Sequence, residues 1–216
     1  MAVKYWIGNT STDATVASNW SSGTIPAQGD ILIFDATAQR DCIGDIATLG
    51  GNGVHLQSVK MTNQFTKQWG SSISNPLVVH ANVVEIDRRT GYGDTYLDLQ
   101  ETSTAGTGGT GDDGTNDMLK ITGGGTTDKF YIKGKVAEMA VTGTASNIFQ
   151  SAIIFADSGA TDTDEGVGIV RVSGDARLGT VSLGPWGTNP KSMTILDNRA
   201  DTSLSLIHIS EPTRPY

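Results

Sequence analysis

The stretch Trp6–Phe34, WIGNTSTDATVASNWSSGTIPAQGDILIF, decides how the chain can fold. It starts at the end of a short apolar and aromatic segment, passes through a polar excursion to a second tryptophan, turns at Gly and Pro, and ends in Ile31–Phe34. A short apolar run bounded by turn-forming residues is typical of a buried strand. The stretch therefore predicts two strands joined by a polar excursion.

Similar short strands are predicted along the remaining chain, separated by Gly-rich turns and polar loops. No segment carries apolar residues at helical spacing over ten or more positions without a glycine, so we expect an all-β protein with almost no helix. The alternation within Val54–Met61 slips once near Gln57 and Ser58, which predicts a β-bulge. Leu77–Val79 and Val83–Ile86 are predicted to be two separate strands.

Two architectures fit this pattern, a β-sandwich and a right-handed parallel β-helix or β-solenoid. We favour the solenoid because FYIKGKVAEMAV (130–141) and IVRVSGDARLGTVSL (169–183) place strand, glycine bend and strand in direct succession, as the corners of a coil require. Polar excursions can leave such a coil at its corners without disturbing the stack. We expect a single solenoid domain over residues 1–203, with residues 1–34 as its N-terminal cap.

Composition excludes several classes of protein. The 216 residues carry a formal charge of −8 and no cluster of basic residues, which argues against nucleic-acid binding. No window is apolar enough for a membrane helix, and the N-terminal residues MAVKYWIG do not form a signal peptide. Cys42 is the single cysteine, which rules out an intrachain disulfide and indicates a small buried side chain.

The segment Leu204–Arg214, LSLIHISEPTR, resembles the conceptual translation of a transposase-type sequencing-library adapter, residue for residue. We therefore interpret residues 204–216 as a non-native tail and exclude His208 from the candidate sites. On this interpretation the chain is a C-terminally truncated fragment from shotgun sequence data. Deleting the residues after Ser203 should leave its stability unchanged.

The opening motif W-x-G, N-W-S and P-x-x-G-D resembles the start of β-helical surface proteins, including bacteriophage virion and tail-spike proteins and bacterial autotransporter-like passengers. Trp6 and Trp20 offer large apolar faces that can plug the open end of a solenoid, and Asn19 can bond the neighbouring backbone. We predict that these three residues form a structural cap. Stacking of either tryptophan on carbohydrate is the alternative.

The resemblance implies a non-enzymatic virion structural or host-recognition protein that assembles in the host cytoplasm and acts in the virion or outside the cell. A secreted adhesin or passenger module is one alternative, and a polysaccharide-degrading tail spike is another. The resemblance also implies a homotrimer or other virion proteins as partners, and a surface glycan as a ligand.

Acidic side chains form the candidate chemical sites. Asp157, Asp162, Asp164 and Glu165 bring several oxygen donors together, as a calcium site needs, although without EF-hand spacing; Asp112, Asp113, Asn116 and Asp117 form a similar loop. Catalytic carboxylates could come from the set Glu85, Asp87, Asp98 and Glu101, but a solvated outer face explains that set better. His55 and His80 lack a nucleophile context, and the glycines of 106–111 lack the Lys-Ser/Thr of a phosphate loop. We predict no catalytic residue and no cofactor other than calcium.

Overall fold

The computed structural model describes residues 1–49, 53–88, 91–99, 116–123, 128–143, 153–155, 166–174, 181–182 and 194–197. Within these ranges the protein is all-β, with one short 3-10 helix at Ala17–Asn19. Twelve strands of the described residues form one unclosed hydrogen-bonded sheet, and every pairing between named strands is parallel. The predicted class is therefore confirmed.

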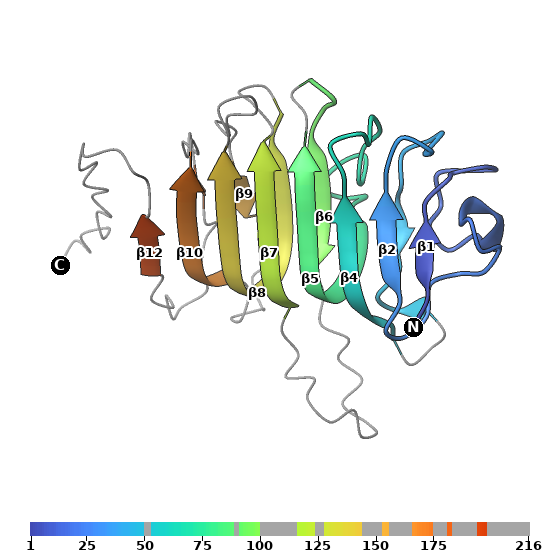
Figure 1. Cartoon of the computed structure of the whole chain (residues 1–216), viewed down its shortest axis with the longest axis horizontal. Coiled ribbons are helices and arrows are strands. Elements are labelled where there is room, and N and C mark those ends of the chain that lie inside the picture. The colour runs from blue at the N-terminus through green and yellow to red at the C-terminus, as the bar shows by residue number, and fades with distance from the viewer. Residues whose placement is uncertain are drawn as a thin grey trace.

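The strands lie in two rows, and from β2 onward the chain visits them in turn (Figure 1). The first row contains β1 (Val3–Tyr5), β2 (Ile31–Phe34), β4 (His55–Met61), the end of β5 (Leu77–Arg88), β7 (Asn116–Gly123), the end of β8 (Phe130–Gly143), β10 (Gly166–Gly174) and β12 (Thr194–Asp197). The second row contains β3 (Gly44–Asp45), the start of β5, β6 (Thr95–Leu99), the start of β8, β9 (Ile153–Phe155) and β11 (Val181–Ser182).

The long strands β5 and β8 belong to both rows. Leu77–Val79 of β5 pair with β3 and β6, whereas the residues from His80 onward pair with β4 and β7. The prediction of two separate strands is therefore wrong, because the backbone stays extended and hydrogen-bonded through the bend. Gln57 and Ser58, where a β-bulge is predicted, are two outward residues between buried Leu56 and Val59, but neither β4 nor β5 has an extra residue there. β5 likewise has two outward residues, Asn82 and Val83, between buried Ala81 and Val84. The register between β4 and β5 therefore stays constant.

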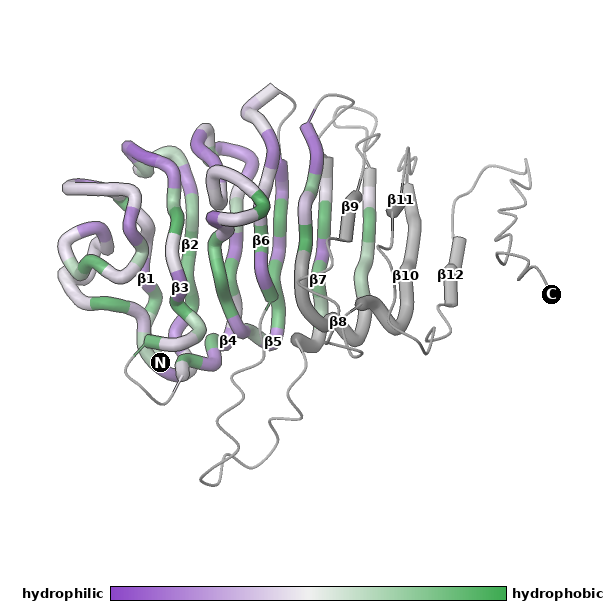
Figure 2. Tube along the Cα trace, turned by 180° about the vertical axis from the view of Figure 1, so that it is seen from behind, coloured by the Kyte–Doolittle hydropathy of each residue, from purple (hydrophilic) through white to green (hydrophobic). Residues whose placement is uncertain are grey.

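Buried side chains form continuous lines across the first row, because parallel neighbours place equivalent residues side by side. One line is Leu32, Val59, Val84, Leu119 and Met139, and a second is Phe34, Met61, Ile86, Ile121 and Val141. Leu77, Leu97 and Ile132 make a matching line in the second row, whose strands Figure 2 shows from behind. These lines belong to one hydrophobic core, and burying such a side chain contributes about 1.5–3 kcal/mol.

Five aromatic rings fill the core at the N-terminal end of the rows. Phe34 is the centre of this cluster, with ring centroids 5.0 Å from Trp69, 5.5 Å from Phe65, 5.9 Å from Trp20 and 6.3 Å from Trp6. Most of these pairs are edge-to-face, the geometry that the charge distribution of aromatic rings favours. Most of the polar excursion Gly8–Asp30 lies beyond β1 in Figure 1, and its end returns to the start of β4, where Gly29 donates its N–H to the His55 carbonyl.

Candidate functional site

The two predicted cap tryptophans are buried where the chain first reverses direction. Trp6 is 0% and Trp20 1% exposed, and their rings meet edge-to-face at 5.2 Å across an antiparallel bridge. Each indole N–H donates to a backbone carbonyl, Trp6 to Arg40 at 2.9 Å and Trp20 to Ala14 at 2.8 Å. Neither ring offers a free face to a sugar. The cap role itself stays a prediction.

Asn19 is fully buried and fixes the excursion that contains it. Its Oδ1 accepts from the backbone N–H groups of Thr10 and Ser11 and from the Thr10 hydroxyl, while its Nδ2 donates to Ser11 Oγ and to the Asp13 carbonyl. Asparagine is typical of such turns, because its short side-chain amide can bond backbone groups that have no backbone partner. The residue is therefore placed to shape this segment.

Antiparallel contacts protect the outer edge of β1. Ser21 donates its N–H to the Tyr5 carbonyl at 2.9 Å, and the Tyr5 N–H donates to Ser21 Oγ at 3.0 Å. An edge strand with free N–H and C=O groups would be a template for pairing with another chain. The excursion therefore satisfies part of the edge that β1 would otherwise expose.

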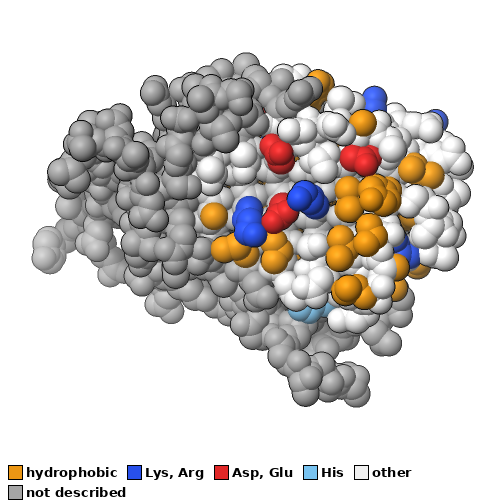
Figure 3. All heavy atoms as spheres, viewed as in Figure 1, with side chains coloured by type: hydrophobic (Ala, Val, Ile, Leu, Met, Phe, Trp, Pro, Cys, Tyr) orange, Lys and Arg blue, Asp and Glu red, His pale blue; other side chains and the backbone are white. Residues whose placement is uncertain are grey.

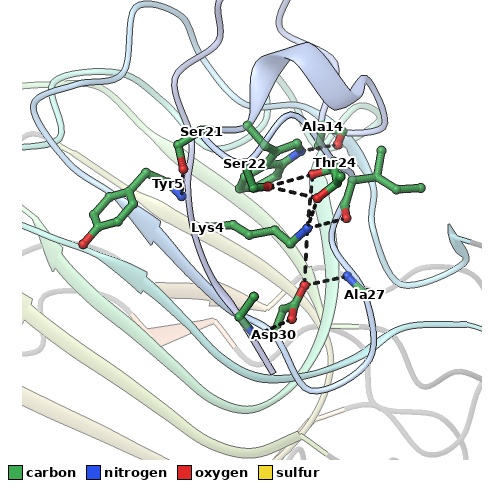
Figure 4. A network of polar contacts seen from close by, with 11 residues as sticks. Lys4, Tyr5, Ala14, Ser21, Ser22, Thr24, Ala27 and Asp30 are labelled. Carbon is green, nitrogen blue, oxygen red and sulfur yellow. Dashed lines mark hydrogen bonds and ion pairs between the residues drawn. The ribbon is translucent and has the colours of Figure 1, made fainter.

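Lys4 and Asp30 form a buried ion pair that the sequence pattern did not reveal (Figure 4). The Lys4 ammonium donates to Thr24 Oγ1 at 2.5 Å and to the Ile25 carbonyl at 2.8 Å, and lies 3.5 Å from Asp30 Oδ2. Asp30 in turn accepts from the N–H groups of Ala2 and Ala27. Lys4 pairs in register with Leu32, so a cation terminates one of the apolar lines of the core.

The outward face of the first row carries a line of alternating charge. Glu85 of β5 lies 3.3 Å from the ammonium of Lys60 on β4 and 3.2 Å from that of Lys120 on β7. Burial by itself would raise the pKa of Glu85, but hydrogen bonds from Lys120 and Lys60 and their positive charges lower it overall. The carboxylate is thus held ionised between two cations.

The four candidate catalytic carboxylates are not brought together in the described residues. Glu85 and Asp87 point outward from the first-row part of β5, whereas Asp98 is buried on β6 and pairs with Val78 in the second row. Glu101 lies outside the described residues. The face that Glu85 shares with lysines matches the solvated-surface interpretation of this set.

The predicted calcium ligands Asp157, Asp162, Asp164 and Glu165 lie outside the described residues, as do Asp112, Asp113 and the glycines of 106–111. Among the residues that the structure describes, no three His, Cys, Asp or Glu side chains gather as metal ligands would. His55 and His80 stack on adjacent strands with ring centroids 4.0 Å apart. Cys42 is buried, which raises the pKa of its thiol, as do the nearby charges of Asp13 and Asp41.

A buried arginine organises the bend after β5, another feature without a signal in the sequence pattern. Arg88 is 0% exposed and donates to the backbone carbonyls of Lys67, Tyr92 and Gly93. Asp128 accepts from the N–H groups of Gly91, Tyr92 and Gly93, so the loop lies between the two charges. Burial lowers the pKa of Arg88, while the charge of Asp128 acts in the opposite direction.

Comparisons with protein families, with curated proteins and with solved structures find no match. In the part of the chain that the structure describes, no helix is long and apolar enough to cross a membrane.

Proposed function

We propose that the two rows of parallel strands form successive coils of a right-handed parallel β-helix or β-solenoid. The regular alternation of the chain between the rows supports this proposal, because each return adds a strand beside the previous one in the same row. The right hand follows from the strong preference of parallel crossover connections for that hand.

We further propose that the protein is a non-enzymatic structural or host-recognition component of a phage particle. The observation that carries this proposal is the stack of parallel strands with its N-terminal Trp6, Asn19 and Trp20, which are the elements of the resemblance. The argument is a fold-level analogy. Glycans and other virion proteins are the expected ligands and partners, and the homotrimer that the resemblance implies stays a prediction.

Mass spectrometry of purified particles tests the proposed location. Virus-sized particles are banded by density from a sample that contains the gene, and the tryptic peptide Tyr5–Arg40 is measured in the band and in the cell extract. We expect the peptide in the particle band together with other virion proteins. Its confinement to the cell extract or to the particle-free medium would overturn the proposal, and the medium alone would favour a secreted adhesin.

A binding and turnover assay tests the non-enzymatic role. The purified chain is incubated with immobilised bacterial surface polysaccharides, and both retained protein and released reducing ends are measured. We expect retention on at least one glycan with no release of reducing ends if the protein recognises hosts, and neither signal if it is purely structural. Release of oligosaccharide would show a polysaccharide-degrading spike instead.

A further inference from the structure

The outward face of the first row carries several apolar side chains that are only partly buried. Val3 is 50% and Tyr5 38% exposed, and the outward side chains of Ile31, Ile33, Val83 and Met118 are half-buried. Figure 3 shows hydrophobic side chains on both sides of a line of charged ones on this face. Exposed apolar side chains that gather on one face favour an interaction surface.

Within the bounds of the strands, the described charges on this face balance, although the chain as a whole is acidic. Among the described side chains of β1, β2, β4, β5 and β7, Lys60 and Lys120 point outward together with Glu85 and Asp87, two cations and two anions. The complete chain has a formal charge of −8, so two copies repel each other as whole molecules. Two copies can therefore approach through the strands of this face with little electrostatic repulsion.

The order of the charges makes the face complementary to itself. The register across β4 and β5 sets Lys60 beside Glu85 at the same height along the strands. We propose that a second copy of this chain covers this face, related by a two-fold axis that runs parallel to the strands between β4 and β5. Lys60 then lies opposite the partner's Glu85, Glu85 opposite the partner's Lys60, and Ile31 opposite the partner's Met118.

This arrangement is an isologous interface, in which one patch pairs with itself. Sheets that pack face to face lie about 10 Å apart, a gap that a lysine and a glutamate can bridge. The proposal goes beyond the proposed function, since a dimer is compatible with a structural, a recognition or an enzymatic role. It also differs from the homotrimer that the resemblance implies.

Charge reversal tests the proposed axis. The mass of the wild-type chain, of Lys60→Glu and of Glu85→Lys is measured by analytical ultracentrifugation over a range of concentrations. We expect a wild-type dimer and at least tenfold weaker association of each variant, because each variant homodimer sets like charges opposite each other. An equimolar mixture of the two variants should form a heterodimer, since the two carboxylates of the first variant then face the two ammonium groups of the second.

Three outcomes would overturn the proposal. If the wild type is a monomer at every soluble concentration, the proposed interface does not exist. If it is a trimer, the proposed two-fold axis is wrong. Variants that associate as tightly as the wild type, or a mixture that associates no better than its components, would remove the pairing of Lys60 with Glu85. Thermal unfolding of each variant separates a folding defect from lost association, and Lys129→Glu, at an exposed lysine outside the face, is the matched control.

Discussion

Lys4 is a charged residue in a position that the core would fill with an apolar one. Its register partner Leu32 begins a line of buried aliphatic side chains, and its ammonium donates hydrogen bonds to Thr24 and Ile25 of the excursion that follows β1. A buried cation is tolerated where oxygen ligands and an opposite charge surround it. Lys4 therefore links the end of the core to the fold of the excursion.

We expect Lys4→Met to lower the free energy of unfolding by about 3 kcal/mol, because Asp30 would remain buried without its cation. The double variant Lys4→Met with Asp30→Asn should recover part of this loss, since no buried charge would be left. Urea denaturation measures the free energy of unfolding of both variants, and Lys129→Met at an exposed position is the control. Equal stability of Lys4→Met and the wild type would contradict the role of the pair.

Glu85 predicts a dependence of stability on pH. Its pKa is lower in the folded protein than in the unfolded chain, so its contribution is present above the unfolded value, near 4.5, and is lost as the pH falls through the folded value. About a third of the side chain is exposed, which keeps the contribution below about 1 kcal/mol. Urea denaturation at pH 7 and pH 3 should show a smaller pH difference for Glu85→Gln than for the wild type. High salt should shrink the wild-type difference, and an identical pH profile for both proteins would refute the ion-pair assignment.

At the scale of elements, β2 and the first-row end of β5 follow from the sequence because inward and outward residues alternate along them. The second row is harder to predict. β3 is only Gly44–Asp45, without any apolar pattern, and it is a strand because Leu77 and Val78 of β5 supply its partners. The line Lys60–Glu85–Lys120 was equally unpredictable, because it depends on the register between strands whose connections vary in length. The burial of Lys4 has no local signal at all.

Gly70 occupies a tight position where the second row is interrupted between Trp69 and β5. Its φ is +69°, and an added Cβ would lie 2.6 Å from both the Cβ and the carbonyl oxygen of Tyr96 and 2.9 Å from the Pro76 Cα. Contacts with backbone atoms at these distances force the neighbouring strand to move. The position therefore requires glycine both for its conformation and for its space.

We expect Gly70→Ala to destabilise the protein well beyond the roughly 1 kcal/mol that a positive φ alone costs. Gly23→Ala is a matched control, because Gly23 has a φ of +64° but no atom within 4 Å of the added Cβ. Thermal unfolding of the two variants isolates the clash from the backbone strain. Equal losses of stability would mean that Tyr96 and Pro76 do not pack against Gly70 as described.

At the scale of the whole molecule, a stack of parallel coils should be stabilised mainly by contacts between neighbouring coils. A destabilising substitution at one end should therefore unfold the nearest strands first. The backbone amides of distant strands should stay protected from hydrogen exchange. A sandwich with a single cooperative core would lose protection throughout. This difference tests both the proposed solenoid and the predicted N-terminal cap.

Trp20→Ala provides that test, because Trp20 packs against Trp6 and Phe34 at the N-terminal end and belongs to no named strand. A buried tryptophan cut back to alanine costs about 3–5 kcal/mol, enough to expose a local opening. Hydrogen exchange followed by mass spectrometry should show faster exchange in β1 and β2 and little change in β7 and β8. Phe130→Ala, at an equally buried position on β8, should reverse this pattern. If both variants exchanged amide hydrogens faster in all strands, a stack of coils held by nearest-neighbour contacts would be contradicted. Only a single cooperative unit would lose protection at both ends after either substitution.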